Sequence, residues 1–190
     1  MKKLTIILLL TIVMQLSVSA SEELSKQAVA FYSDNNFNKA LEILLQIDER
    51  HKTPQDWLLL GNIYEEKGEK QNAVYMYQKA IVVNKKYYKA YYNLANLFLE
   101  DENYNIAIEH YKKAISLNKS NPYLYYNLAC AYIKNGDIKK AKTNLIKAVT
   151  LKNDIPEIHY NLAYVYNSLD KKDIAQTYLD NYNKLTQQEL

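Results

Sequence analysis

The sequence predicts an all-α fold, a right-handed α-solenoid of about five stacked helical hairpins, because similar residues recur every 34 positions. Aromatic rings, small residues and alanines all follow this step. The three series are Trp57, Tyr91, Tyr125 and His159, then Gly61, Ala95, Ala129 and Ala163, then Ala73, Ala107, Ala141 and Ala175. Units that recur at a fixed period of this length bury their apolar faces only by stacking on their neighbours.

Each repeat carries two amphipathic helices separated by a short break. In the third repeat the apolar residues of the first helix recur at i, i+3, i+4 and i+7, and the second helix follows the same rule after a break at 101–103. The two stripes are Tyr91, Leu94, Ala95 and Phe98, then Tyr104, Ala107, Ile108, Tyr111, Ala114 and Ile115. Two such helices joined by a short turn form a helical hairpin. We expect the recurring small residues to lie where a larger side chain would hold the two helices apart.

These residues resemble the tetratricopeptide repeat family, whose pattern is an aromatic, Leu-Gly or Leu-Ala, a second aromatic, and later alanines around a bulky residue. The second repeat matches the pattern with Trp57, Leu60, Gly61, Tyr64, Gly68, Ala73, Tyr77 and Ala80. The first repeat is degenerate and one residue short, and the fifth departs from the pattern at His159 and Tyr182. The units run approximately over 21–53, 54–87, 88–121, 122–155 and 156–189. The resemblance implies a scaffold that binds a protein partner in a concave groove.

Residues that start and stop helices agree with this division. Thr53-Pro54 and Asn121-Pro122 each place a capping side chain before a proline at the first helical position. Gly68 and Gly136 fit turns that need a positive φ. Ser21, followed by two acidic residues, predicts another helix start.

Residues 1–20 have the layout of a secretory signal peptide. A positive start is followed by an apolar run from Leu4 to Val13 and by the small residues Val18-Ser19-Ala20. We therefore expect cleavage after Ala20 and an exported protein, located in the periplasm or cell envelope. The alternative is an uncleaved membrane anchor, which the polar residues within the leader disfavour.

Charge and composition exclude several classes of function. Loss of Lys2 and Lys3 with the leader leaves 22 basic against 21 acidic residues, a net charge of +1. A near-neutral chain without a basic block is not expected to bind nucleic acid. The single Cys excludes an internal disulfide. The abundance of Lys, Asn, Ile and Tyr is typical of an AT-rich bacterial genome.

The sequence contains no motif that predicts catalysis, a cofactor or a metal site. His51, His110 and His159 lie in different repeats, without a second ligand at metal-binding spacing. No Gly-rich loop could hold a phosphate, and no serine motif resembles a nucleophile elbow. We expect a non-enzymatic protein in which His159 packs as the counterpart of Trp57.

The candidate binding residues lie on the face of each first helix opposite the core stripe. In the resembling family this face lines the concave groove. The residues are Lys89, Tyr92, Asn93, Asn96, Tyr123, Tyr126, Asn127, Cys130, Tyr160, Asn161 and Tyr164. Amides both donate and accept hydrogen bonds, and tyrosine rings offer rigid contact area with a polar tip. We expect them to hold an extended or helical segment of a partner protein.

The same residues can also be explained without a binding role. Asn93, Asn127 and Asn161 can bond within the array, and a chain with 19 tyrosines places some rings in the groove by composition alone. Cys130 is either an exposed, reactive thiol or a half-buried, inert one, and we favour the inert thiol.

Two other functions also stay open. A chain that keeps residues 1–20 would be a membrane-anchored accessory subunit of an envelope complex. A chain that stacks on itself would be a structural protein, a homo-oligomer joined through the C-terminal helix. The apolar stripe of that helix consists of Ile174, Tyr178, Leu179, Tyr182 and Leu185.

Overall fold

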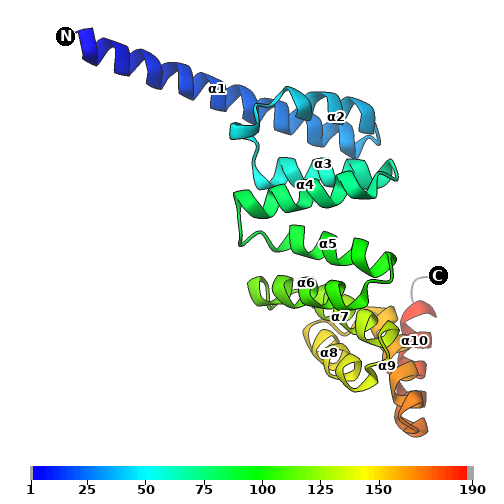
Figure 1. The fold of residues 1–190 in the computed structure, drawn as a ribbon. Coiled ribbons are helices and arrows are strands. Elements are labelled where there is room, and N and C mark those ends of the chain that lie inside the picture. The colour runs from blue at the N-terminus through cyan, green and yellow to red at the C-terminus, as the bar shows by residue number, and fades with distance from the viewer. Residues whose placement is uncertain (1, 188–190) are drawn as a thin grey trace. The chain divides into compact units, whose positions relative to one another are not determined.

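The computed structural model describes residues 2–187, and its helices pair into five hairpins (Figure 1). The first helices of the hairpins are α1 (Lys2–Ser33), α3 (Pro54–Glu66), α5 (Tyr88–Glu100), α7 (Pro122–Lys134) and α9 (Pro156–Ser168). The second helices are α2 (Phe37–Gln46), α4 (Lys70–Val83), α6 (Tyr104–Leu117), α8 (Ile138–Leu151) and α10 (Lys172–Gln187). A short 3-10 helix, η1 (Glu49–His51), precedes α3. The prediction of an all-α fold built from stacked helical hairpins is confirmed, although Met1 and residues 188–190 lie outside the described part.

The helices form two compact units, which meet in sequence between Tyr87 and Tyr88. The first unit contains the hairpins α1–α2 and α3–α4, and α2 packs on α3. The second contains α5–α6, α7–α8 and α9–α10, and there each second helix packs on the first helix of the next hairpin. The predicted unit boundary at 87/88 therefore coincides with the division into compact units.

The recurring small residues lie at the closest approach of the two helices in a hairpin. Ala95, Ala129 and Ala141 are fully buried in one apolar cluster of the second unit. In the first unit, a Cβ added to Gly61 would lie 2.2 Å from Cε1 of Tyr77, whose ring is fully buried. The expectation that larger side chains would hold the helices apart is confirmed, because no atoms approach so closely without displacement.

The turn inside every hairpin contains one residue in the left-handed region of the backbone. The predicted positive φ is confirmed for Gly68 (φ 73°) and Gly136 (φ 81°). The corresponding residues of the other hairpins are Asn35 (φ 58°), Glu102 (φ 58°) and Asp170 (φ 56°). Asn and Asp tolerate this conformation, whereas Glu gains nothing that offsets its steric cost.

Both predicted proline-linked caps are present. The Thr53 hydroxyl accepts from the backbone N–H of Asp56, and the Asp56 carboxylate accepts from the backbone N–H of Thr53, which forms a capping box. The side chain of Asn121 accepts a hydrogen bond from the backbone N–H of Tyr123, 3.0 Å away. These caps fix where α3 and α7 begin.

The predicted helix start at Ser21 is wrong for the full-length chain, because α1 runs through this position without a break. The Ser21 hydroxyl donates to the carbonyl of Ser17 one turn earlier, at 2.9 Å, and does not cap. The leader contains no Gly or Pro, so nothing in it ends the helix. Figure 1 shows α1 extending past α2 towards the N-terminus, and Met14 and Leu16 there are 66% and 65% exposed. Within residues 2–187, the structure contains no helix with the length and apolar character needed to cross a membrane.

The helix α1 also has a polar face where other first helices are apolar. On α9 the side chains of Ile158, Leu162 and Val165 are fully buried, and α9 packs on α8. The corresponding residues on α1 are Glu23, Gln27 and Ala30, which are all exposed. A polar outer face of this kind is what keeps the end of a repeat array soluble.

The single tryptophan lies in the first unit, between two lysines. Trp57 is buried, and the Nζ atoms of Lys52 and Lys79 lie 5.5 and 5.4 Å from the centre of its ring. Lys52 is itself buried and donates to the carbonyl of Ile47, and burial lowers the pKa of its ammonium group. Cations over an aromatic ring attract its π electrons, so the ring and the lysines hold this hairpin boundary together.

Candidate protein-binding face

The eleven residues predicted to line a groove lie on three first helices of the second unit, and we call this set the tyrosine–asparagine face. Helix α5 supplies Lys89, Tyr92, Asn93 and Asn96. Helix α7 supplies Tyr123, Tyr126, Asn127 and Cys130, and α9 supplies Tyr160, Asn161 and Tyr164. Side-chain contacts between neighbouring helices join α5 to α7 and α7 to α9, so the structure brings the three groups together.

Exposure divides this face into two kinds of residue. Tyr123, Tyr160 and Tyr164 are 46%, 54% and 51% exposed, so about half of each of these large side chains is open to a partner. Lys89 is exposed as well. The remaining members, including Tyr92 and the four asparagines, are half-buried between the helices. The exposed rings are therefore the part of the face that can contribute most to binding.

Several half-buried amides bond within the protein. The Asn127 amide nitrogen donates to the Tyr92 hydroxyl at 2.8 Å, which links two successive hairpins. The Asn161 amide nitrogen lies 3.4 Å from the Cys130 sulfur, which links the next two. The Asn96 side-chain oxygen accepts a 2.6 Å bond from Tyr111 of its own hairpin. These amides therefore bond within the repeat array, which was one of the two interpretations of the sequence. Each amide still has further donors or acceptors for a partner.

The thiol of Cys130 is enclosed by its neighbours. Burial raises its pKa, against the opposing effect of hydrogen bonds from Tyr126 and Asn161. Burial also raises the pKa of the Tyr126 hydroxyl, so both groups stay protonated at neutral pH. Because the thiolate is the reactive form, the structure agrees with the interpretation of an inert thiol.

Two histidines of the second unit are packed rings. Nε2 of His159 lies 2.6 Å from the carbonyl of Asn153, and its ring centre lies 5.9 Å from that of Tyr178. His110 stacks on Phe98 at 5.6 Å with an interplanar angle of 4°, and burial lowers the pKa of His110. Throughout residues 2–187, no three His, Cys, Asp or Glu side chains gather in a way that could hold a metal ion.

The apolar stripe of the last helix is only partly covered, since Ile174 is 40% exposed and the other four residues are half-buried. The Tyr178 ring stacks on Tyr166 of α9, with ring centres 5.5 Å apart. Tyr182 lies against Tyr160, with ring centres 5.4 Å apart. These two tyrosines therefore contact the first helix of their own hairpin, while Ile174 stays open. A homo-oligomer through the C-terminal helix stays a prediction.

Sequence reasoning missed a groove between α9 and α10. The groove has a volume of about 440 Å³, and Tyr160 and Tyr164 of the tyrosine–asparagine face form one side. The other side belongs to α10, with Lys172, Gln176 and Leu179. The repeat could have predicted this groove. The corresponding residues one repeat earlier are Ile138, Lys142 and Leu145 on α8, the helix on which α9 packs.

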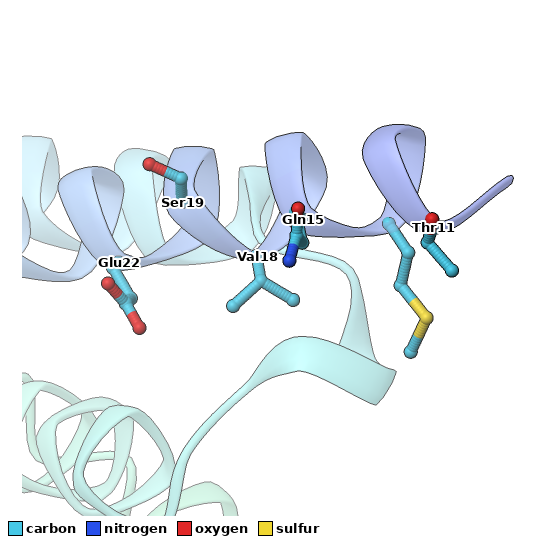
Figure 2. A pocket seen from close by; sticks show the side chains of 6 residues that line it. Thr11, Gln15, Val18, Ser19 and Glu22 are labelled. Carbon is cyan, nitrogen blue, oxygen red and sulfur yellow. The ribbon is translucent and has the colours of Figure 1, made fainter. Parts of the chain in front are cut away.

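Two shallow hollows lie along α1 in the first unit. One, of about 470 Å³, is lined within residues 11–22 and includes Met14 and Val18. Figure 2 shows Val18 and Glu22 projecting from the same side of this helix. The other, of about 450 Å³, continues from Glu22 to Val29 and reaches the start of α3 at Thr53. Most of the first hollow belongs to the predicted leader, so a cleaved chain would keep only the second.

Family comparisons agree with the repeat seen in the structure. The TPR repeat profile matches residues 95–136 and 130–170, and tetratricopeptide repeat profiles match 57–87, 76–109 and 156–188. Together these matches extend from 57 to 188. The chain is a tetratricopeptide repeat protein. No curated protein matches its sequence.

Solved structures of MamA and pilF have the same fold at low sequence identity. A crystal structure of MamA is 20% identical, with a TM-score of 0.77, and the match covers 85% of this chain and 95% of that one. MamA from Desulfovibrio magneticus RS-1 is 19% identical, with a TM-score of 0.79, covering 89% and 96%. The pilF protein of Pseudomonas aeruginosa is 17% identical, with a TM-score of 0.79, covering 88% and 77%. At these identities the likeness concerns the fold alone.

Proposed function

We propose that the chain is a non-enzymatic scaffold of the cell envelope, which holds a segment of a partner protein on the tyrosine–asparagine face. The observation that carries this proposal is the exposure of Tyr123, Tyr160 and Tyr164 on neighbouring helices. Large rings left half open on a folded surface are typical of protein interfaces, where tyrosine is enriched among the residues that contribute most.

The chemistry of the face favours a partner segment with alternating apolar and polar groups. The three exposed rings offer apolar contact, and a tyrosine hydroxyl can both donate to and accept from a backbone. The half-buried amides cross-link α5, α7 and α9, so the rings start from a fixed arrangement. A fixed arrangement reduces the conformational entropy that binding costs.

A photo-crosslinking experiment tests the face directly. A photoreactive residue would replace Tyr123, which does not line the groove between α9 and α10, in one sample and Lys147, an exposed residue of α8, in the control. Capture of one envelope protein from position 123 and not from position 147 supports the proposal. Equal capture at the two positions, or none at either, moves the function away from this face.

Export of the chain is the second part of the proposal, and residues 1–20 would be a signal peptide cleaved after Ala20. The lengths of the helices support this boundary. From Ser21 to Ser33, α1 would keep 13 residues, the length of α3, α5, α7 and α9. The apolar side chains described before Ser21 are exposed and add little to the first hairpin, namely Ile7, Met14, Leu16 and Val18. The mature chain would then begin with a complete first helix.

The mass of the protein purified from its native envelope tests the export proposal. A mass that begins at Ser21 supports cleavage. A mass that begins at Met1, with the protein in the membrane fraction, would favour the anchored accessory subunit. A particle size that grows with concentration would favour the self-assembling structural protein.

A further inference from the structure

We propose that the groove between α9 and α10 is a second binding site, which receives one amphipathic helix from another protein. In the preceding hairpins of the second unit, the corresponding groove is filled by the first helix of the following repeat. No helix follows α10 within residues 2–187, so nothing in the described chain fills this last groove.

The floor of the groove is the same as that of a groove already filled in this protein. Ala163, Ala175 and Leu179 form it, and one repeat earlier the same residue types stand at Ala129, Ala141 and Leu145. There Ala129, Ala141 and Leu145 are all fully buried. A floor with identical side chains keeps the shape that accepts a helix.

The helix that fills the earlier groove shows what the last one can accept. Helix α9 packs on α8 and contacts α7, with Ile158, Leu162 and Val165 fully buried at i, i+4 and i+7. Its Asn161 approaches Cys130 beside this stripe. The expected occupant therefore carries an apolar stripe of this spacing, with a polar residue next to it.

The rim of the last groove differs in polarity from the rim of the earlier one. Lys172 replaces Ile138, Asn167 replaces Ile133, and Tyr164 replaces Cys130. Polar rims keep an empty groove soluble and select a partner by hydrogen bonds and charge. The side chain of Lys172 is 79% exposed, with its Nζ 3.9 Å from an Asp170 oxygen, so the occupant should place an acidic residue at this end.

A second copy of the chain fits this groove poorly. Its own unstacked first helix is α1, where Glu23, Gln27 and Ala30 stand in place of the buried stripe of α9. Inserting Glu23 and Gln27 into an apolar floor would leave polar groups without partners. This mismatch is the reason to assign the groove to a different protein.

A peptide of residues 155–168, which contains α9, is the probe that tests the site. The fluorescently labelled peptide is titrated with the full chain, and we expect saturable binding. Leu179→Lys should weaken binding at least tenfold, because it places a charge on the apolar floor. The matched control is Leu151→Lys, at an exposed leucine at the end of α8, which should bind as the unmodified chain does. A peptide that carries Ile158→Asp and Leu162→Asp should not bind.

Three further results separate this site from the tyrosine–asparagine face and from self-association. Tyr123→Ala on α7 should leave peptide binding unchanged even if it abolishes partner capture. A peptide with Ser168→Asp, which places an acid at the end nearest Lys172, should bind more tightly than the unmodified peptide, and Lys172→Glu in the full chain should remove this gain. This comparison tests the site if Leu179→Lys fails to fold. Failure to saturate below about 1 mM, or equal binding of both peptides, would overturn the proposal. Light scattering that shows a dimer lost on Leu179→Lys would also overturn it, because a second copy would then fill the groove.

Discussion

The side-chain amide of Asn127 on α7 donates to the hydroxyl of Tyr92 on α5, with 2.8 Å between nitrogen and oxygen. The Tyr92 ring in turn lies 6.1 Å from the buried ring of Tyr111 on α6. A residue of the tyrosine–asparagine face in one hairpin is thereby tied to the core of the hairpin before it. Asn127 therefore helps to hold the face together.

The Asn127–Tyr92 bond should appear as a coupling energy between hairpins. Asn127→Ala, Tyr92→Phe and the double variant form a double-mutant cycle, and we expect a coupling of about 0.5–1.5 kcal/mol in the free energy of unfolding. Urea unfolding followed by circular dichroism measures it. If the effects of the two substitutions are additive, the Asn127–Tyr92 bond does not stabilise the fold, and the amide of Asn127 is available only for a partner protein.

The left-handed turn residues should reverse the usual effect of glycine. Glu102→Gly should raise the free energy of unfolding by about 0.5–1 kcal/mol, because glycine adopts φ 58° without steric cost. The control is Glu109→Gly in the middle of α6, which should lower it by about 1 kcal/mol. Chemical denaturation of the three proteins gives the comparison, and a loss of stability in both variants would contradict the prediction.

Gly61 should tolerate a methyl group only if Tyr77 changes with it. Gly61→Ala should cost about 1–3 kcal/mol by overpacking against the Tyr77 ring. The lower end is expected, since Ala95 and Tyr111 coexist at these positions in the next hairpin. Adding Tyr77→Leu reproduces the Ala129–Leu145 pair of the fourth hairpin. The double variant should therefore cost less than the sum of the two single changes, and a full sum would exclude the steric explanation.

The stability of the second unit should fall in mild acid because of His110. Burial lowers its pKa from the ordinary 6.5, so the folded chain binds fewer protons than the unfolded chain below this pH. The stabilisation that neutral His110 gives the folded chain is fully present above pH 6.5. It is lost as the pH falls through the pKa of His110 in the folded chain. The free energy of unfolding should change by less than the roughly 1.4 kcal/mol per pH unit that one full proton would give, since the ring is partly exposed.

His110→Gln should flatten this pH dependence between pH 7.5 and pH 5.5, as measured by urea midpoints at each pH. His51→Gln, in the first unit, is the control variant. An unchanged slope in His110→Gln would assign the acid sensitivity to another group.

Periodicity alone made the helices and their pairing predictable, because each repeat sets the same residue types at the same spacing. The positive φ of Glu102 was not predictable in this way, because among these turns only Gly68 and Gly136 are of a residue type that favours a positive φ. The prediction at Ser21 was wrong because a capping residue starts a helix only when the preceding chain does not continue it, and residues 2–20 do continue it.

The composition of the candidate face followed from helical spacing, but its division into exposed and bonded residues did not. Asn127 and Asn161 have the same neighbours in sequence, yet Asn127 bonds only the Tyr92 hydroxyl among the bonds described, whereas Asn161 approaches the Cys130 sulfur as well as the Tyr126 hydroxyl. Their partners are set by which residue of the previous repeat lies opposite. The groove between α9 and α10 was not predictable from the spacing within one helix, which does not show that Tyr160 of α9 and Leu179 of α10 line the same hollow.

The position of Trp57 gives the molecule an optical probe in only one of its two units. The indole, packed between Lys52 and Lys79, emits from the hairpins before Tyr88, and the later hairpins contain no second tryptophan. Tryptophan fluorescence therefore reports the unfolding of the first unit, while circular dichroism reports the average loss of helix in both units. The separation of the two curves measures how strongly one unit depends on the other.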